Sequence, residues 1–240
     1  MRKRMANKKV NVDGLSSYVH HLFPTPVAFS NINRKFSKKE LDIFKTHEED
    51  ENLRSNSGNR SSINNNILEH EDMCDIKTYC QNFVNDYLNN IICPLYDVEL
   101  YITQSWLNHT KPGEFHHRHN HANSYLSGVF YISADAASDK IFFYKDGHKQ
   151  IQLITKSWND FNSDSWWFTV KTGDIILFPS ELTHMVQNVE SKVPRISLAF
   201  NTFIKGYIGS DEALTGLHLG YETPMAERKY KTSSSNESND

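Results

Sequence analysis

Residues 115–132 read FHHRHNHANSYLSGVFYI, and this stretch decides how the rest of the chain is interpreted. Four of the chain's 12 histidines lie within six of its residues, namely His116, His117, His119 and His121. Alternate side chains of an extended strand share a face, so we expect His117, His119 and His121 to point the same way. Two imidazoles on one face, one residue apart, can bind the same metal ion. One more ligand beside an open position would complete a catalytic site.

The histidine tract lies inside the chain and leads directly into SYLSGVFYIS (residues 124–133), a run rich in apolar, aromatic and β-branched residues. A histidine-rich tract alone also fits a solvated loop, because a motif is only a hypothesis until its structural context is met. Support for a metal site therefore has to come from elsewhere in the chain.

Length and composition limit the class of protein. A chain of 240 residues with 38% hydrophobic residues fits one domain with appendages. The net charge of −3 gives no general attraction to nucleic acid or to an anionic membrane. Three cysteines without CxxC spacing indicate reduced thiols. Without an apolar signal segment or membrane span, we expect a soluble, cytoplasmic protein, in the host cytoplasm if it is phage-encoded.

From residue 98 onward the hydrophobic pattern has period two. Short β-branched and aromatic runs, separated by Gly, Pro, Asp and Asn, are typical of an antiparallel sandwich or barrel. The chain is therefore expected to be mainly β with supporting N-terminal helices. Its expected segments are a flexible basic arm (1–18), a helical supporting layer (19–96), the β core (97–207) and a C-terminal extension with a disordered tail (208–240).

Two helices are expected before the β core. Ser37 is a predicted N-cap for residues 38–49, with Glu40 at the capping-box position and Leu41 and Phe44 on the buried face. The second helix is expected over residues 71–92. Its predicted apolar stripe comprises Met73, Ile76, Tyr79, Cys80, Phe83, Tyr87 and Ile91.

Two further N-terminal stretches have no helical pattern. Residues 22–32 contain two prolines, which restrict them to an edge strand or an extended entry segment. Residues 52–66 are polar and rich in Asn and Ser, so we expect a loop.

The β core supplies a second set of candidate site residues. His184 follows the predicted buried strand in TGDIILFPS (172–180) by four residues and would lie at the mouth of a barrel. Arg195 comes eleven residues later, and Ser197 shares its face on a strand. A buried arginine is costly unless it meets an anion, so an inward Arg195 near a metal suggests a bound carboxylate.

The order of these residues resembles a known family. The chain is similar to the iron(II)- and 2-oxoglutarate-dependent oxygenases, in particular to a small, often phage- or marine-associated subgroup with the signature HxHxNSxxSGVxY. The signature reads HNHANSYLSGVFY over residues 119–131. The segments GDIILFPSELTH (173–184) and RISLAFN (195–201) also resemble that subgroup, and the resemblance covers residues 98 to 205.

The resemblance implies a double-stranded β-helix, or jelly roll, with Fe(II) at its open end. His119, His121 and His184 would be the metal ligands, with His121 where most of the superfamily has Asp or Glu. A set of three histidine ligands also suits zinc. His117 and His119 form an alternative pair. Arg195 would bind the distal carboxylate of 2-oxoglutarate, assisted by Ser197 and by Tyr131 or Tyr125.

Other residues are expected near this site. Trp106 and Asn108 would line its mouth, whereas Trp166 and Trp167 are neighbours on a strand and cannot both face it. Residues 206–225 would form either a lid or a dimer contact.

The predicted function is that of a dioxygenase. It would oxidise an unidentified substrate in a hydroxylase-type reaction with dioxygen, while 2-oxoglutarate is decarboxylated to succinate. No membrane partner is expected, and nucleic acid only if it is the substrate. Two alternatives remain: a three-histidine, cupin-like metal enzyme that does not use 2-oxoglutarate, and a jelly-roll binding module without catalysis. Only the oxygenase needs the carboxylate clamp at Arg195.

Overall fold

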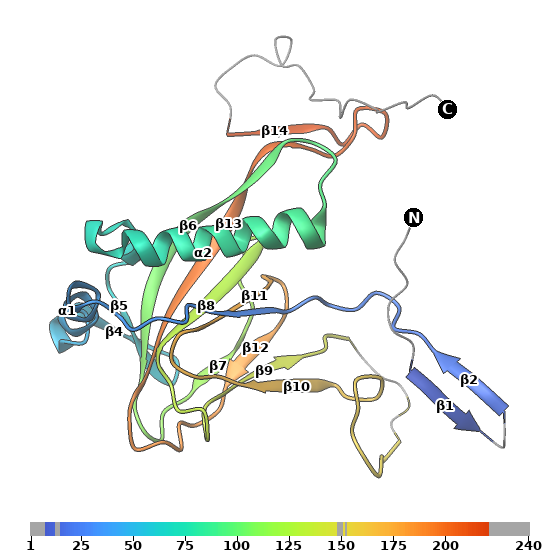
Figure 1. The fold of residues 1–240 in the computed structure, drawn as a ribbon, viewed down its shortest axis with the longest axis horizontal. Coiled ribbons are helices and arrows are strands. Elements are labelled where there is room, and N and C mark those ends of the chain that lie inside the picture. Colours follow the sequence, from blue (N-terminus) through green and yellow to red (C-terminus); the bar gives the residue numbers. More distant parts are fainter. Residues whose placement is uncertain (1–7, 13–14, 148–150, 152, 221–240) are drawn as a thin grey trace.

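The computed structural model describes residues 8–12, 15–147, 151 and 153–220, so the predicted tail from residue 226 lies outside the described residues. Two antiparallel sheets face each other, and a long helix lies across the outer face of the larger one (Figure 1). The predicted period-two core is confirmed, because every apolar run expected from residue 98 onward contains a strand.

Consecutive strands of the core are distributed between the two sheets as in a jelly roll. The larger sheet takes β6 (Val98–Thr110), β8 (Leu126–Ser133), β11 (Asp174–Pro179) and β13 (Arg195–Ile208). The smaller sheet takes β7 (His116–His119), β9 (Lys140–Tyr144), β10 (Ser165–Thr169) and β12 (His184–Val186). The spatial orders are β11-β8-β13-β6 and β10-β9-β12-β7. This arrangement is a double-stranded β-helix.

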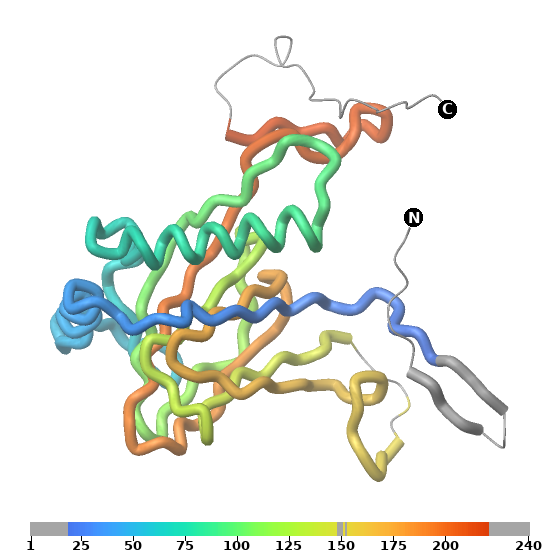
Figure 2. Tube along the Cα trace, viewed as in Figure 1, coloured from blue at the N-terminus to red at the C-terminus, as the bar shows by residue number. Residues whose placement is uncertain are grey.

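The N-terminal residues extend the larger sheet at both edges. β3 (Ala28–Asn31) pairs with β11 at one edge, as predicted for the proline-containing segment, and the chain leading into it crosses the outside of the sheets (Figure 2). At the other edge β5 (Asn59–Ser62) pairs with β6, and β4 (Leu53–Asn56) pairs with β5. The predicted loop over residues 52–66 is thus wrong in part, because its polar side chains occupy a tight edge hairpin.

Helix α1 (Lys38–Thr46) begins with the predicted capping box. The Ser37 hydroxyl accepts a hydrogen bond from the Glu40 backbone N–H, and the Glu40 carboxylate accepts one from the Ser37 N–H. The predicted buried face is wrong by one position, because Leu41 is 42% exposed and Ile43 is buried beside Phe44. Glu40 is buried as well, paired with Arg34.

The second helical segment covers the outer face of the larger sheet. It begins as a 3₁₀ turn (Glu71–Met73), continues as α2 (Cys74–Tyr87) and ends as a π-helical turn (Leu88–Ile92). The predicted stripe is buried at Met73, Ile76, Cys80 and Tyr87, whereas Ile91 is 51% exposed. The π turn shifts the helical phase at Ile91, and Leu88 is the buried residue of this last turn.

The remaining elements lie at the two ends of the chain. β1 (Lys8–Val12) and β2 (Leu15–Val19) pair as a separate hairpin within the predicted basic arm. Short 3₁₀ turns follow α1 at Asp50–Asn52 and precede α2 at Ile67–Glu69. β14 (Leu217–Leu219) pairs with the end of β13. In the part of the chain that the structure describes, no helix has the length and apolarity to cross a membrane.

Alternation along β8 and β13 sends side chains into two cores. Phe130, Leu198 and Phe200 join the core beneath the helices. Tyr131 joins a smaller core with Ile176 between the sheets. Strand parity therefore sends Arg195 and Ser197, which alternate with Leu198 and Phe200, into the space between the two sheets. That space holds the candidate site.

Candidate functional site

Strand pairing brings the predicted histidines together. His119 ends β7 and lies directly opposite His184, which begins β12. His121 lies two residues beyond β7, where its backbone N–H donates to the Ser180 carbonyl at 2.9 Å. The predicted strand through residue 121 is therefore shorter than expected. The nitrogen ligand atoms of His119, His121 and His184 all lie within 4.8 Å of one another, and we call this set the inner triad.

Hydrogen bonds set which nitrogen of each inner-triad ring is available. His119 Nδ1 lies 2.7 Å from the His117 carbonyl, and His184 Nδ1 lies 3.0 Å from the Leu182 carbonyl. Because a carbonyl only accepts, both Nδ1 atoms carry the hydrogen. The Nε2 lone pairs are then free to bind a metal ion, which is the usual arrangement of a ligating histidine.

His121 is held by a buried polar network. Its Nδ1 lies 2.7 Å from Asn201 Oδ1 and 2.8 Å from Ser127 Oγ. Ser127 Oγ lies 2.9 Å from Ser180 Oγ, which donates to Ser124 Oγ at 2.7 Å. These three serines and Asn201 all belong to the quoted motifs, but sequence reasoning gave them no role. The network orients His121 in the way that outer partners orient metal ligands.

A glycine of the signature is explained by packing beside this network. A Cβ at Gly128 would lie 2.1 Å from the Phe200 ring, closer than any real contact. Gly128 therefore lets β8 and β13 lie together at the level of Ser127 and Asn201.

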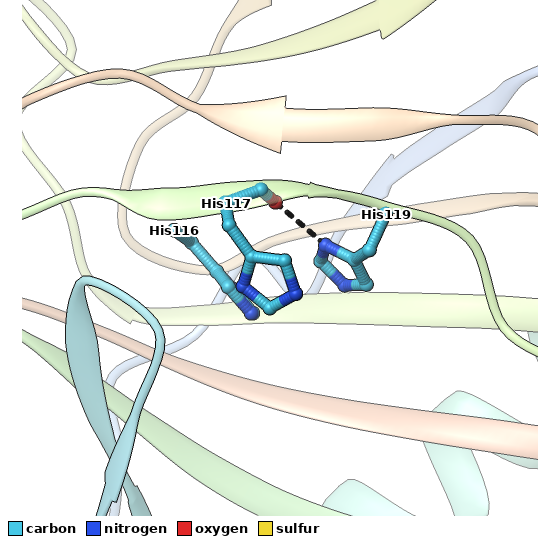
Figure 3. Close-up of side chains that lie close together, drawn as sticks. All are labelled: His116, His117 and His119. Atoms are coloured by element: carbon cyan, nitrogen blue, oxygen red, sulfur yellow. Dashed lines mark hydrogen bonds between the residues drawn. The ribbon is translucent and has the colours of Figure 1, made fainter.

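A second histidine cluster shares His119. A β-bulge places one extra residue in β7 opposite β12, between the His119–His184 and His116–Val186 pairs. A bulge breaks the strict alternation of side chains. His116 consequently points to the same side as His117 and His119, as Figure 3 shows. The ligand atoms of these three also lie within 4.8 Å of one another, and we call this set the outer triad.

The hairpin β4–β5, which sequence reasoning missed, supports the outer triad. Asn56 Nδ2 donates to His116 Nε2 at 3.2 Å, and His117 Nδ1 donates to the Ser57 carbonyl at 3.3 Å. Phe115 N–H donates to the Gly58 carbonyl at 3.0 Å. Gly58 has φ +91° and lies so close to Phe115 that a Cβ would clash. The asparagine- and glycine-containing turn was the sequence signal for this hairpin.

Burial keeps the histidines neutral. It lowers the pKa of His184 to about 3, helped by the neighbouring His119, and the pKa of His119 to about 4. It lowers the pKa of His116 to about 2 and also lowers that of His121, against the raising effect of the Asn201 hydrogen bond. At neutral pH these rings have the lone pairs that metal coordination requires.

Arg195 lines the same cavity as the histidines, at the start of β13, whereas Asn201, the partner of His121, lies six residues further along that strand. The Arg195 side chain is 2% exposed, and its Nε and Nη1 atoms have no hydrogen-bond partner in the part of the chain that the structure describes. Nη2 makes a single long contact of 3.5 Å to Thr110 Oγ1. The ion pairs found among the described residues do not include Arg195. Burial lowers its pKa, but a guanidinium stays charged at neutral pH.

Other unpartnered polar atoms lie beside Arg195. Tyr131 Oη is buried without a hydrogen-bond partner among the described residues, and burial raises the pKa of this phenol. Asn108 Oδ1 is buried and unpartnered as well. The cavity that joins the arginine to the histidines has a volume of about 30 Å³. Its lining is Trp106, Asn108, His116, His119, His121, Val129, Tyr131, Ile141, His184, Val186, Arg195, Ser197 and Ala199.

Most of the predicted site residues therefore meet in one place, and three aromatic residues do not. Tyr125 lies in the turn before β8 and borders an apolar groove with Leu88 and Ile204, so it is not beside Arg195. Trp166 and Trp167 on β10 are 45% and 48% exposed and lie outside the cavity. β10 is the edge strand of the smaller sheet, which leaves both rings near solvent.

A family model with the description "Putative 2OG-Fe(II) oxygenase" matches residues 104–201, the segment that runs from β6 to β13 and carries both triads and Arg195. The segment that forms the jelly roll is therefore similar to the 2OG-Fe(II) oxygenases. Its cofactors are accordingly Fe(II) and 2-oxoglutarate. The match covers less than half of the chain, and no curated protein is significantly similar to it in sequence.

Solved structures of other proteins resemble the fold at low sequence identity. The non-heme alpha ketoglutarate dependent epimerase SnoN from nogalamycin biosynthesis has a TM-score of 0.54 and 10% identity, over 75% of this chain and 78% of that one. A Pseudomonas putida prolyl-4-hydroxylase has a TM-score of 0.46 and 15% identity, over 74% and 92% of the two chains. The likeness to SnoN shows a shared fold.

The donor set of the cavity fits both cofactors. Three neutral imidazoles with free Nε2 atoms suit a divalent metal ion, and the unpartnered guanidinium of Arg195 suits a carboxylate.

Proposed function

We propose that this 2OG-Fe(II) oxygenase oxidises its substrate in a hydroxylase-type reaction with iron held by His119, His121 and His184. The reaction would consume dioxygen and 2-oxoglutarate, release succinate and carbon dioxide, and insert one oxygen atom into a C–H bond of the substrate. Bound iron(II) would supply the activation of dioxygen that links these two oxidations.

The observation that carries this proposal is the state of Arg195. A buried guanidinium with two unpartnered nitrogens is costly, and a carboxylate that accepts from both would remove that cost. Tyr131 Oη and Ser197 lie in the same cavity and can donate to the same carboxylate. The runner-up, a three-histidine metal enzyme without 2-oxoglutarate, gives no reason for this arginine to lie there.

The other residues of the cavity would position and shield the reactants. Asn201 and Ser127 would keep His121 Nδ1 engaged, so that Nε2 stays directed at the metal. Trp106 is partly exposed, and its ring lies 5.8 Å from the His121 ring. We propose that this indole forms part of the wall between the metal and the bound substrate, where it limits access of water.

The test is conversion of 2-oxoglutarate to succinate in air by protein loaded with Fe(II), with ascorbate as reductant while the substrate is unidentified. We expect slow succinate release by the wild type, and none above background for His184→Phe or Arg195→Met. Arg54→Met is the matched control, because Arg54 is exposed on β4. Succinate release by Arg195→Met at the wild-type rate would contradict the role of Arg195. Iron binding without succinate release by the wild type would favour the cupin-like alternative.

A further inference from the structure

We propose that the outer triad is a second metal site, of the zinc type, and that it competes with the inner triad for His119. The outer triad is formed by His116, His117 and His119, whose ligand atoms, like those of the inner triad, all lie within 4.8 Å of one another. Three imidazoles with room for a water molecule are a common ligand set for zinc.

The bulge in β7 is the structural origin of this site. In a regular strand His116 would point away from His117 and His119. Instead the His116 ring centroid lies 5.2 Å from that of His117 and 4.5 Å from that of His119, and the three rings project from the same side of β7 (Figure 3). Bulges often redirect side chains next to active sites, so the cluster follows from a defined backbone feature.

Each member of the outer triad has a nitrogen that can bind a cation. His117 Nδ1 donates to the Ser57 carbonyl, which leaves Nε2 with its lone pair. His116 Nε2 accepts from the Asn56 amide at 3.2 Å, the long end of the hydrogen-bond range, so a cation would displace a weak partner. Burial holds the pKa of His116 far below neutrality, so its lone pair is present at neutral pH.

His119 makes the two sites mutually exclusive. Its Nδ1 hydrogen is donated to the His117 carbonyl at 2.7 Å, so Nε2 has the only available lone pair. The ring centroid lies 4.7 Å from that of His117 in the outer triad and 4.3 Å from that of His184 in the inner triad. One lone pair binds one metal ion at a time. An ion in the outer triad would leave only His121 and His184 in the inner triad.

The consequence for regulation rests on the proposed function, whereas the existence of the outer site does not. If the inner triad holds the catalytic iron, occupation of the outer triad gives a form without a complete iron site. Zinc-type ions would then inhibit by taking His119, in addition to any direct exchange with iron.

Zinc stoichiometry tests the proposal without an activity measurement. Equilibrium dialysis against Zn(II), at a concentration that saturates the wild type, is followed by metal analysis of folded protein. We expect one zinc for the wild type, one for His117→Ala through the inner triad, and one for His184→Phe through the outer triad. The double variant His117→Ala/His184→Phe should bind none. His20→Ala, at an exposed histidine outside both triads, should bind one.

Each failure has a separate meaning. Two zinc ions on the wild type would overturn the competition for His119. No zinc on His184→Phe would overturn the outer site, and His184→Gln repeats this test if the phenylalanine variant does not fold. No zinc on His117→Ala with one on His184→Phe would instead remove the inner site, and with it the proposed iron ligands.

Discussion

The two ends of the cavity between the sheets differ in how completely their buried polar atoms are partnered. At the histidine end, Nδ1 of each inner-triad ring has a hydrogen-bond acceptor from the protein within 3.0 Å. At the arginine end, two nitrogens of Arg195 and the hydroxyl of Tyr131 have no hydrogen-bond partner within the described ranges of the chain. Both ends are inside the same jelly roll, so the difference lies in the kind of binding partner that each end still lacks.

An inner-triad ring whose Nδ1 is hydrogen-bonded is already oriented, and its Nε2 keeps a single lone pair that is directed at the cavity. The binding partner that this lone pair still lacks is a cation. An unpartnered guanidinium is an uncompensated cost to the fold, and its missing neighbour is an anion. The contrast therefore assigns the metal ion to one end and the carboxylate of 2-oxoglutarate to the other, which is the division of roles in the proposed function.

The largest expected effect is at the histidine end. His119→Ala removes a ligand from both triads, so neither triad can bind the metal ion in place of the other. We expect iron(II) affinity to fall by more than about 100-fold, beyond the loss expected for a residue that only supports a ligand. Anaerobic iron titration measures it, with His20→Ala as the control. Iron affinity within a few-fold of the wild type would show that the metal lies elsewhere.

The next effect separates the two ends. Arg195→Met should weaken 2-oxoglutarate binding at least about 30-fold, because it removes the charged partner of a buried carboxylate. Iron affinity should not change. Without cosubstrate the variant should be more stable by about 1–3 kcal/mol, since a buried donor without a partner is removed. Calorimetric titration and urea unfolding measure these quantities. A less stable variant would instead indicate a structural ion pair.

A third prediction tests the orientation of His121. Asn201→Ala removes an acceptor of its Nδ1 hydrogen, and the expected loss of iron affinity is about 10- to 100-fold. Asn201→Asp keeps an acceptor and strengthens it, so its iron affinity should equal or exceed that of the wild type. The same iron titration compares the two variants. Equal affinities in both would mean that the network is structural only.

The smallest effect concerns a buried charge that has its partner. Burial by itself would raise the pKa of Glu40, but hydrogen bonds from Arg34 and Ser37 lower it below the ordinary value of 4.5. Glu40→Gln should therefore cost about 1–2 kcal/mol at pH 7. Because the folded-state pKa is lowered, this stabilisation is complete above the ordinary value and declines as the pH falls through the folded-state value.

Urea unfolding of wild type and Glu40→Gln at pH 7 and at decreasing pH measures that difference. Lys39→Gln, at the exposed ion pair with Asp72, is the control, and we expect no measurable change. A difference that grows as the pH falls would contradict the lowered pKa of Glu40.

The sequence was most informative where period two is regular. Alternation placed Arg195 and Ser197 on the inner face of β13, and the structure confirms it. The approach of His119 to His184 followed only from the resemblance, because pairing between distant strands has no local signal. Leu41 was misplaced because the capping-box Glu40 is buried with Arg34, which rotates the buried face of α1.

The bulge in β7 and the hairpin β4–β5 account for the features of the site that the sequence did not predict. One extra residue in β7 brings His116 into the outer triad, and a strict alternation rule cannot predict such an insertion. The residues of β4–β5 read as a loop because they are polar. They form strands because they pair with β6 and because Asn56 and Ser57 bind the histidine tract. Tertiary contacts outweighed local propensity at both places.

The central claim is that one cavity binds iron at its histidine end and the 2-oxoglutarate carboxylate at its arginine end. Anaerobic addition of Fe(II) and then 2-oxoglutarate tests it, through the weak visible charge-transfer band of an iron-chelated keto acid. We predict the band in the wild type and in His117→Ala, and its absence in His184→Phe and, at the same 2-oxoglutarate concentration, in Arg195→Met. A band of wild-type intensity in Arg195→Met, or no band in iron-loaded wild type, would contradict the claim.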